Sequence, residues 1–173
     1  KGVELDVQLS KDGELVIYHD WKLKNKHGRY EKISSIDYAD ILTASNNNYH
    51  IPLLNEVLDI LPKDRFINIE IKSLSLFSTG IEEKILREII KYNVLKNVVI
   101  SSFNPFVLKR IKKMSPLISS AYLWTNTKSP ILFNTPLWVF ICQPDGMHID
   151  INNTDEKIIQ WAKRKKMTVL SYT

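Results

Sequence analysis

Two segments of the chain, residues 2–10 and 66–72, alternate polar and aliphatic residues with a period of two. Side chains at positions i and i+2 share one face of a β-strand, so each segment predicts a strand with one charged and one aliphatic face. The aliphatic faces must be buried against other elements of the fold, and the charged faces must share one polar interior. The chain is therefore restricted to folds in which strands of the same inward phase lie close together.

The charged faces of these two strands carry three carboxylates and one ammonium. Glu4 and Asp6 share a face of the first strand, and Glu70 and Lys72 share a face of the second. Isolated buried charges are costly, and crowded carboxylates raise one another's pKa unless a cation neutralises them. The pattern favours a hard divalent ion, and oxygen ligands suit Mg²⁺ or Ca²⁺ better than Zn²⁺. The alternatives are a solvent-facing edge strand and, for Lys72, a plain ion pair with Glu70.

Length and composition are typical of one globular domain of 173 residues, with 44% hydrophobic and 25% charged residues. No apolar run reaches the ~18 residues of a membrane span, and no basic-then-apolar leader opens the chain. The net charge of +5 comes from lysines and arginines that do not alternate with aromatic residues, so we expect no nucleic-acid partner. The one cysteine, Cys142, is expected to be a small core residue, and it does not indicate the redox compartment. The cytoplasm is slightly favoured because no targeting segment is found in this chain.

Strand and helix signals alternate along the chain. Strands are expected over residues 3–9, 65–72, 98–101, 118–123, 147–151 and 168–172. An extended continuation over 14–18 leads to His19, and a loop rich in Lys, Asn and Gly follows. The order predicts an α/β fold with a parallel sheet covered on both faces. A closed barrel is favoured over an open doubly wound sheet, because the glycine fingerprint of the open sheet is missing.

Three of the expected helices carry start signals. Thr79 and Glu82 stand at capping-box spacing, Asn104 precedes a proline at the first helical position, and Asn153 precedes Glu156 by three residues.

The segment Gly2–Asp20, GVELDVQLSKDGELVIYHD, closely resembles the signature of the glycerophosphodiester phosphodiesterases. The resemblance continues in order through residues 51–58, 68–72 and 100–103. It ends at residues 171–173, where tyrosine replaces the tryptophan usual in the family. The resemblance implies a TIM (β/α)8 barrel and a divalent-metal-dependent phosphoric diester hydrolase. Such an enzyme converts a glycerophosphodiester, a small molecule, to glycerol 3-phosphate and an alcohol.

The resemblance also implies roles for individual residues. Glu4, Asp6 and Glu70 would hold the metal ion. His19 would act as general acid/base, and Lys72 would offset negative charge in the transition state. Phe103 and Tyr172 would form walls of the substrate site, although core packing is a close alternative for both. A turn role is the alternative for His19.

The sequence departs from the family at both ends. The family's first strand, which ends in His-Arg-Gly, and its eighth strand have no counterpart here. We therefore expect residues 1–173 to be a single, incomplete barrel domain that lacks the second catalytic histidine and is inactive alone. The alternatives are a catalytically lapsed barrel that binds a phosphodiester or protein partner without turnover and, less favoured, a sphingomyelinase D. Asp150 is a weak site candidate, and His27, His50 and His148 are expected in loops or at strand ends.

Overall fold

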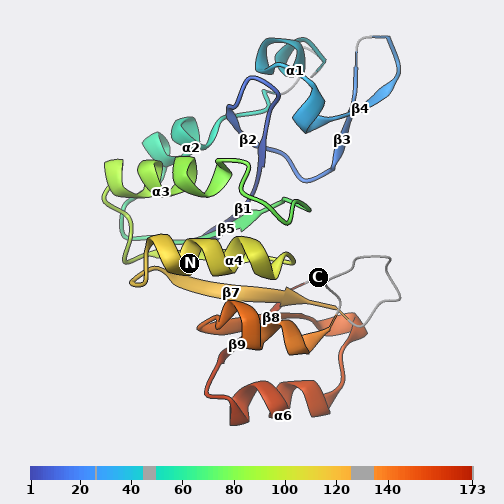
Figure 1. Ribbon diagram of the computed structural model, residues 1–173. Helices are drawn as coiled ribbons and strands as arrows, with labels where there is room; N and C mark the ends of the chain where they lie inside the picture. The colour runs from blue at the N-terminus through green and yellow to red at the C-terminus, as the bar shows by residue number, and fades with distance from the viewer. Residues whose placement is uncertain (26, 45–49, 126–134, 173) are drawn as a thin grey trace.

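The computed structural model describes residues 1–25, 27–44, 50–125 and 135–172. Its central element is a seven-stranded sheet (Figure 1). The strands of this sheet are β1 (Gly2–Leu9), β2 (Leu15–Ile17), β5 (Phe66–Ile71), β6 (Val98–Ser102), β7 (Ser119–Trp124), β8 (Gly146–Asp150) and β9 (Thr168–Tyr172). Their order is β2-β1-β5-β6-β7-β8-β9, and every neighbouring pair is parallel except β1 and β2.

The helices lie in the connections between the parallel strands. They are α1 (Tyr38–Ala44), α2 (Leu54–Ile60), α3 (Ile81–Lys91), α4 (Pro105–Met114), α5 (Val139–Cys142) and α6 (Glu156–Arg164), with short 3₁₀ turns η1 (Ile33–Ser35), η2 (Pro136–Trp138) and η3 (Ile151–Asn153). Helices α2, α3 and α4 cover the outer face of the sheet, and their aliphatic side chains pack with the outward side chains of the strands in one buried core. None of the described helices is long and apolar enough to cross a bilayer.

The six strands predicted from the sequence are confirmed, and they follow one another in the sheet in chain order. The α/β prediction and the barrel prediction are also confirmed, since the parallel strands β1, β5, β6, β7, β8 and β9 correspond to consecutive strands of a (β/α)8 barrel. Their carboxyl ends lie on one side of the molecule, and this is the end at which barrels of this class place functional groups.

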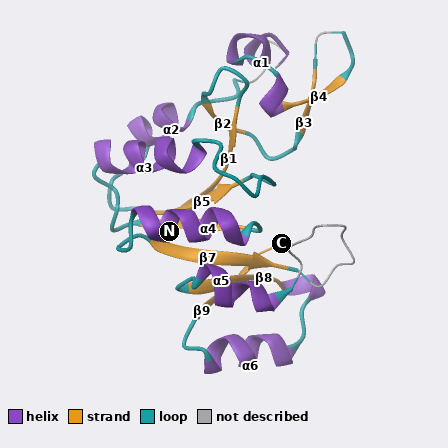
Figure 2. Ribbon diagram, in the orientation of Figure 1, coloured by secondary structure: helices purple, strands orange, loops and turns teal. Residues whose placement is uncertain are grey.

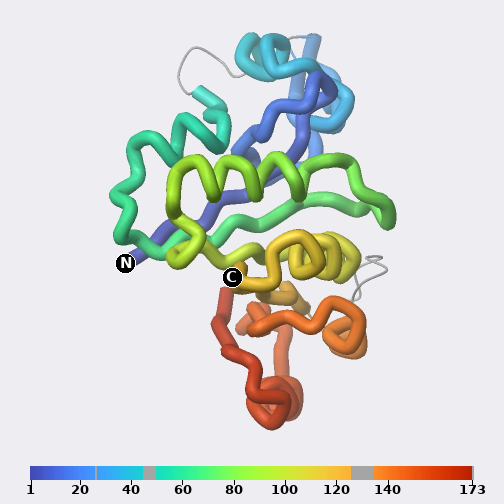
Figure 3. Tube along the Cα trace, turned by 60° about the vertical axis from the view of Figure 1, so that its left-hand side comes forward, coloured from blue at the N-terminus to red at the C-terminus, as the bar shows by residue number. Residues whose placement is uncertain are grey.

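A small antiparallel unit occupies the region that the sequence predicts as a loop. Strands β3 (Lys22–Lys24) and β4 (Tyr30–Lys32) pair with each other, and η1 and α1 follow (Figure 2). Leu23, Ile33 and Ile41 form part of a second buried cluster under this unit. These three-residue strands contain one buried side chain, Leu23, between them, so they show no period in the sequence. The unit lies at one end of the molecule, and α6 lies at the other (Figures 1 and 3).

The predicted helix starts have mixed outcomes. Asn104 caps α4, because its side chain accepts a hydrogen bond from Phe106 N. The capping box at Thr79 is wrong: Gly80 is the N-cap of α3, with a φ of 84° that favours glycine. The cap at Asn153 is also wrong, because Asp155 caps α6.

Candidate functional site

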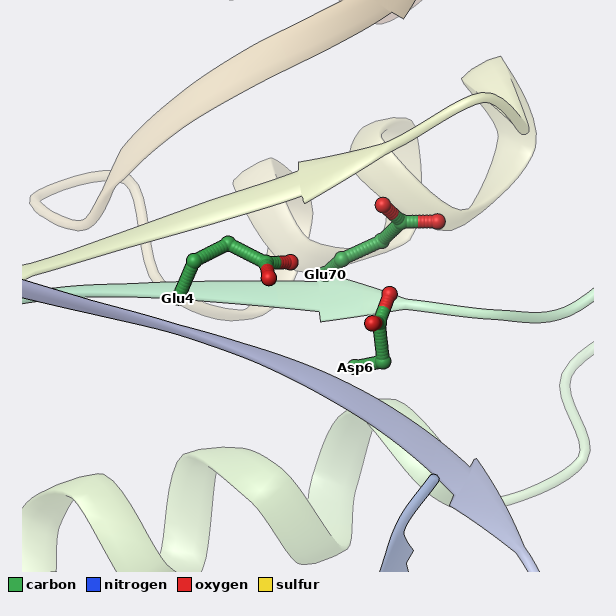
Figure 4. Close-up of side chains that lie close together, drawn as sticks. All are labelled: Glu4, Asp6 and Glu70. Atoms are coloured by element: carbon green, nitrogen blue, oxygen red, sulfur yellow. The ribbon is translucent and has the colours of Figure 1, made fainter. Parts of the chain in front are cut away.

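Three carboxylates from two neighbouring strands meet at the carboxyl end of the sheet. Glu4 and Asp6 extend from β1 and Glu70 from β5, into the same space (Figure 4). Strand register explains the meeting, because Asp6 is the direct partner of Glu70 in the parallel β1–β5 ladder. One carboxylate oxygen of each residue lies within 4.8 Å of the others. We call these three residues the carboxylate cluster.

Lys72 lies against the carboxylate cluster. Its Nζ is 3.1 Å from Asp6 Oδ1 and 3.3 Å from Glu70 Oε1. The side chains of Lys72, Asp6 and Glu70 are 9%, 13% and 12% exposed, so water screens their charges poorly. When all three carboxyl groups are ionised, one ammonium leaves two negative charges uncompensated, which is the charge that a divalent cation would balance.

The pKa values reflect this crowding. Burial raises the pKa of Glu70 to about 7, although the adjacent Lys72 ammonium lowers it. Burial, followed by the charge of Asp6, raises the pKa of Glu4. Burial disfavours the charged form of Lys72, but attraction to Glu70 and Asp6 outweighs this effect and raises its pKa. Full ionisation of all three carboxyl groups is therefore unfavourable without a further positive charge beside them.

A cavity of about 460 Å³ is lined by all seven residues to which the family resemblance gives a role. Its lining consists of Glu4, Asp6, His19, Asn68, Glu70, Lys72, Phe103, Leu123, His148 and Tyr172. We call it the carboxylate cavity. The strands β1, β5, β7, β8 and β9 all contribute, so residues far apart in sequence share one space.

His19 sits on an exposed segment that is held by buried neighbours. Its side chain is 77% exposed, and Nδ1 lies 2.9 Å from Asp20 Oδ1. The Nε2 of Gln8, which is 4% exposed, donates to the carbonyls of Tyr18 at 2.7 Å and Asp20 at 2.8 Å. The backbone on both sides of His19 is thus fixed to the inner face of β1.

An aromatic pair also lines the carboxylate cavity, with Phe103 after β6 and Tyr172 at the end of β9. Phe103 and Tyr172 meet edge to face, with ring centroids 6.2 Å apart and planes at 85°. The Tyr172 hydroxyl donates to the Trp124 carbonyl at 3.3 Å, and burial raises its pKa, so it stays protonated. The pair presents a partly apolar wall to the carboxylate cavity. The last residue of the resemblance, Thr173, lies outside the described residues.

Sequence reasoning missed three residues of this site. His148, expected at a strand end, lines the carboxylate cavity from β8; it is 7% exposed, and burial lowers its pKa. Asn68 stands beside Glu4 in the β1–β5 register, and its buried Oδ1 has no hydrogen-bond partner among the described residues. Gln8 is the third. All three residues occupy strand positions whose side chains point to the inner face of the sheet, and this position in the alternating pattern could have identified them.

The remaining candidates lie outside the carboxylate cavity. His27 is in the β3–β4 unit, and His50 pairs with Glu56 at 3.0 Å. Asp150 accepts hydrogen bonds from Thr125 and from Asn153, so it stabilises the η3 turn.

The donors of the carboxylate cluster fit a hard divalent ion. Two oxygens bound to one Ca²⁺ at about 2.3–2.6 Å can be no more than about 5 Å apart, and the observed separations fall within this limit. The donors are all oxygens, and Asn68 adds a buried oxygen without a donor nearby. Glu4, Asp6 and Glu70 are therefore the residues that could hold a metal ion.

The fold and the site define a parallel α/β barrel with an acidic, metal-competent centre at the carboxyl ends of its strands. The chain matches the model of the glycerophosphoryl diester phosphodiesterase family over residues 1–173, and it belongs to that family.

Relatives and solved structures agree with this assignment. The chain is 39% identical over 132 residues to a glycerophosphodiester phosphodiesterase of Caldanaerobacter subterraneus subsp. tengcongensis, a match covering 71% of this chain and 54% of the relative. A glycerophosphodiester phosphodiesterase structure from Thermotoga maritima is 27% identical, with TM-score 0.71, covering 99% of this chain and 72% of that one. An Oleispira antarctica phosphodiesterase, solved with the product sn-glycerol-3-phosphate, is 26% identical, with TM-score 0.71, covering 100% and 72%. The chain spans about half the length of the curated relatives it matches.

Proposed function

We propose that the full-length protein carrying this chain hydrolyses glycerophosphodiesters to sn-glycerol 3-phosphate and an alcohol, using Mg²⁺ or Ca²⁺. The observation that carries the proposal is the meeting of the carboxylate cluster with Lys72 and His19 in one cavity. Family membership supports the reaction class, and the product bound by the Oleispira antarctica phosphodiesterase supports the substrate class. A single barrel domain over residues 1–173 is part of the same proposal.

Glu4, Asp6 and Glu70 would hold the metal ion. When bound, the ion supplies charge stabilisation to the phosphate oxygens as a Lewis acid. Lys72 contributes a second positive charge from a buried position, where it stabilises developing negative charge more strongly than it would in water. Asn68 offers its unpaired Oδ1 as an acceptor for a substrate hydroxyl.

His19 would transfer the proton that the leaving alkoxide needs. An imidazole titrates near neutral pH, which suits it to give and take a proton in one cycle. Its exposure at the cavity rim leaves Nε2 accessible, while Asp20 lies beside Nδ1 and orients the ring. Phe103 and Tyr172 would bound the glycerol part of the substrate on the other side.

The direct test incubates the full-length protein with glycerophosphocholine or glycerophosphoglycerol, with Mg²⁺, with Ca²⁺, and with chelator. We expect sn-glycerol 3-phosphate to be released in the presence of a divalent ion and not in chelator. Binding of the substrate without release of product under any of these conditions would overturn the proposal in favour of a lapsed barrel. Comparing the two ions decides which one the site prefers.

A further inference from the structure

A second cavity, of about 490 Å³, adjoins the carboxylate cavity. Lys72 lines both. The lining of the second cavity comes mainly from the loop after β5 and from the β3–β4 unit, and it includes Lys72, Trp21, Lys22, Lys32, Leu74 and several serines. We call it the lysine groove. It lies beyond the carboxyl ends of β1 and β5, the end of the sheet at which barrels of this class place functional groups.

The charge of the lysine groove has one sign. Its described lining contains four lysines and no Asp or Glu. Two of these lysines are already neutralised, Lys11 by Asp37 at 3.0 Å and Lys72 by the carboxylate cluster. Lys22 and Lys32 have no carboxylate partner among the ion pairs of the described residues.

The two unpaired lysines are forced together by strand register. Lys22 on β3 is the direct cross-strand partner of Lys32 on β4. Direct partners in an antiparallel pair share a face, and like charges at such positions are destabilising. Leu23 points to the other face and is 5% exposed, so the hairpin's own core fixes the lysines toward the groove. An anion between the two ammonium groups would relieve their repulsion.

On the basis of the proposed function, we propose that the lysine groove binds a second phosphate carried by the leaving alcohol of the substrate. The preferred substrate class is then a glycerophosphodiester whose alcohol is itself phosphorylated, as in bis(glycerophospho)glycerol. Water adds at one phosphorus and the P–O bond to the leaving alcohol breaks. The products are glycerol 3-phosphate and glycerophosphoglycerol, which takes up the proton. Trp21, 44% exposed, provides an apolar wall for the carbon chain between the phosphates.

The test compares bis(glycerophospho)glycerol with glycerophosphoglycerol, which lacks the second phosphate. In the full-length protein with its metal ion, we expect kcat/KM to favour the first by about fivefold to thirtyfold, as for charge-assisted contacts at an exposed site. The preference should shrink as salt concentration rises. In the double variant Lys22→Gln, Lys32→Gln, the ratio should fall close to one.

Lys24→Gln is the matched control, because Lys24 is on the same strand and also exposed but does not line the groove. It removes the same charge and should keep the ratio. A ratio near one in the unaltered protein, or an equal loss in Lys24→Gln, would overturn the inference.

A calorimetric binding measurement with the same two compounds separates this inference from the proposed function. Absence of hydrolysis with both compounds would refute the proposed function alone. A binding preference for the second phosphate that depends on Lys22 and Lys32 would still support the groove, and equal binding of the two compounds would refute it.

Discussion

The carboxylate cavity and the lysine groove share Lys72, yet they are built in different ways. The acidic cavity takes its charged groups from the parallel strands β1 and β5, where register fixes Asp6 beside Glu70. The groove takes its lysines from a short hairpin and a loop beyond the sheet. Strand ends hold groups rigidly for chemistry, and connecting segments can vary without disturbing them. We therefore expect residues of the sheet to determine the reaction and residues of the hairpin to determine the substrate preference.

The two regions predict opposite responses to mutation. Changes in the carboxylate cavity should alter turnover or metal affinity for every substrate. Changes in the lysine groove should alter the ratio between substrates. A variant that changes both properties together would break the comparison.

The largest effect is expected at His19. We expect His19→Ala to lower kcat by about 10² to 10⁴, the range for a proton-transfer group, while metal affinity stays nearly unchanged. Steady-state kinetics and a calorimetric metal titration measure the two quantities. His27→Ala is the control, since His27 lies in the β3–β4 unit outside the cavity. A collapse of metal affinity in His19→Ala would show instead that His19 is a ligand.

The next effect is on the metal ion. Asp6→Asn removes one charged oxygen and leaves Lys72 with Glu70 alone, so we expect Mg²⁺ or Ca²⁺ affinity to fall by about 10- to 100-fold. Isothermal titration calorimetry measures the loss. Asp64→Asn, a change at an exposed carboxylate before the amino end of β5, the end of the strand opposite Glu70, should have no effect. Unchanged affinity in Asp6→Asn would remove Asp6 from the proposed ligand set.

The contrast between the two regions also explains what the sequence reveals. Glu4, Asp6, Glu70 and Lys72 could be predicted as one site because their period of two sets their phase and parallel pairing sets their neighbours. The hairpin that carries Lys22 could not be predicted, because each of its strands has three residues and only Leu23 of β3 is buried. Leu23 lies in one buried cluster with Ile33 of η1 and Ile41 of α1, and the sequence of the strands alone does not show this packing.

The roles of single residues on the inner face of the sheet could not be predicted for a related reason. His148 lies in a strand whose other residues are also buried, so its sequence neighbours do not distinguish a core histidine from a cavity histidine. Gln8 has the inward phase of Glu4 and Asp6, but only the return of the chain through β2 shows what it holds. Strand identity and phase follow from local sequence, whereas the contents of a cavity depend on the packing of distant segments.

A smaller effect on turnover tests whether the sheet positions His19. Gln8→Met keeps the side chain's length and removes the two hydrogen bonds to the carbonyls of Tyr18 and Asp20. We expect kcat to fall about tenfold because the imidazole loses its fixed position, while KM and metal affinity stay close to their original values. A thermal melt confirms folding. A parallel loss of metal affinity would mean that Gln8 supports β1 as a whole and does not act through His19.

The smallest effect concerns the attachment of the hairpin unit to the sheet. The Asp12 carboxylate accepts hydrogen bonds from Ser10 Oγ at 2.5 Å and Tyr38 N at 3.0 Å, which joins the end of β1 to the start of α1. The Ser10 hydroxyl, helped by the Tyr38 amide, lowers the pKa of Asp12 below its ordinary value of 3.8, although burial opposes the shift. The folded state therefore binds the Asp12 proton less tightly than the unfolded state does.

The sign of the pH dependence follows from this lowered pKa. The stabilisation by ionised Asp12 is fully present above pH 3.8 and is lost as the pH falls through the lower folded-state value. We expect Asp12→Asn to lower the free energy of unfolding at pH 7 by about 0.5 kcal/mol, the low end for a capping carboxylate, or about 1–2 °C in Tm. The difference should disappear in acid.

Ser10 also lines the lysine groove, so the preference for a second phosphate should weaken slightly in Asp12→Asn while metal affinity stays unchanged. A change in metal affinity without a change in preference would show that the hairpin unit supports the carboxylate cavity, and the division between the two regions would fail.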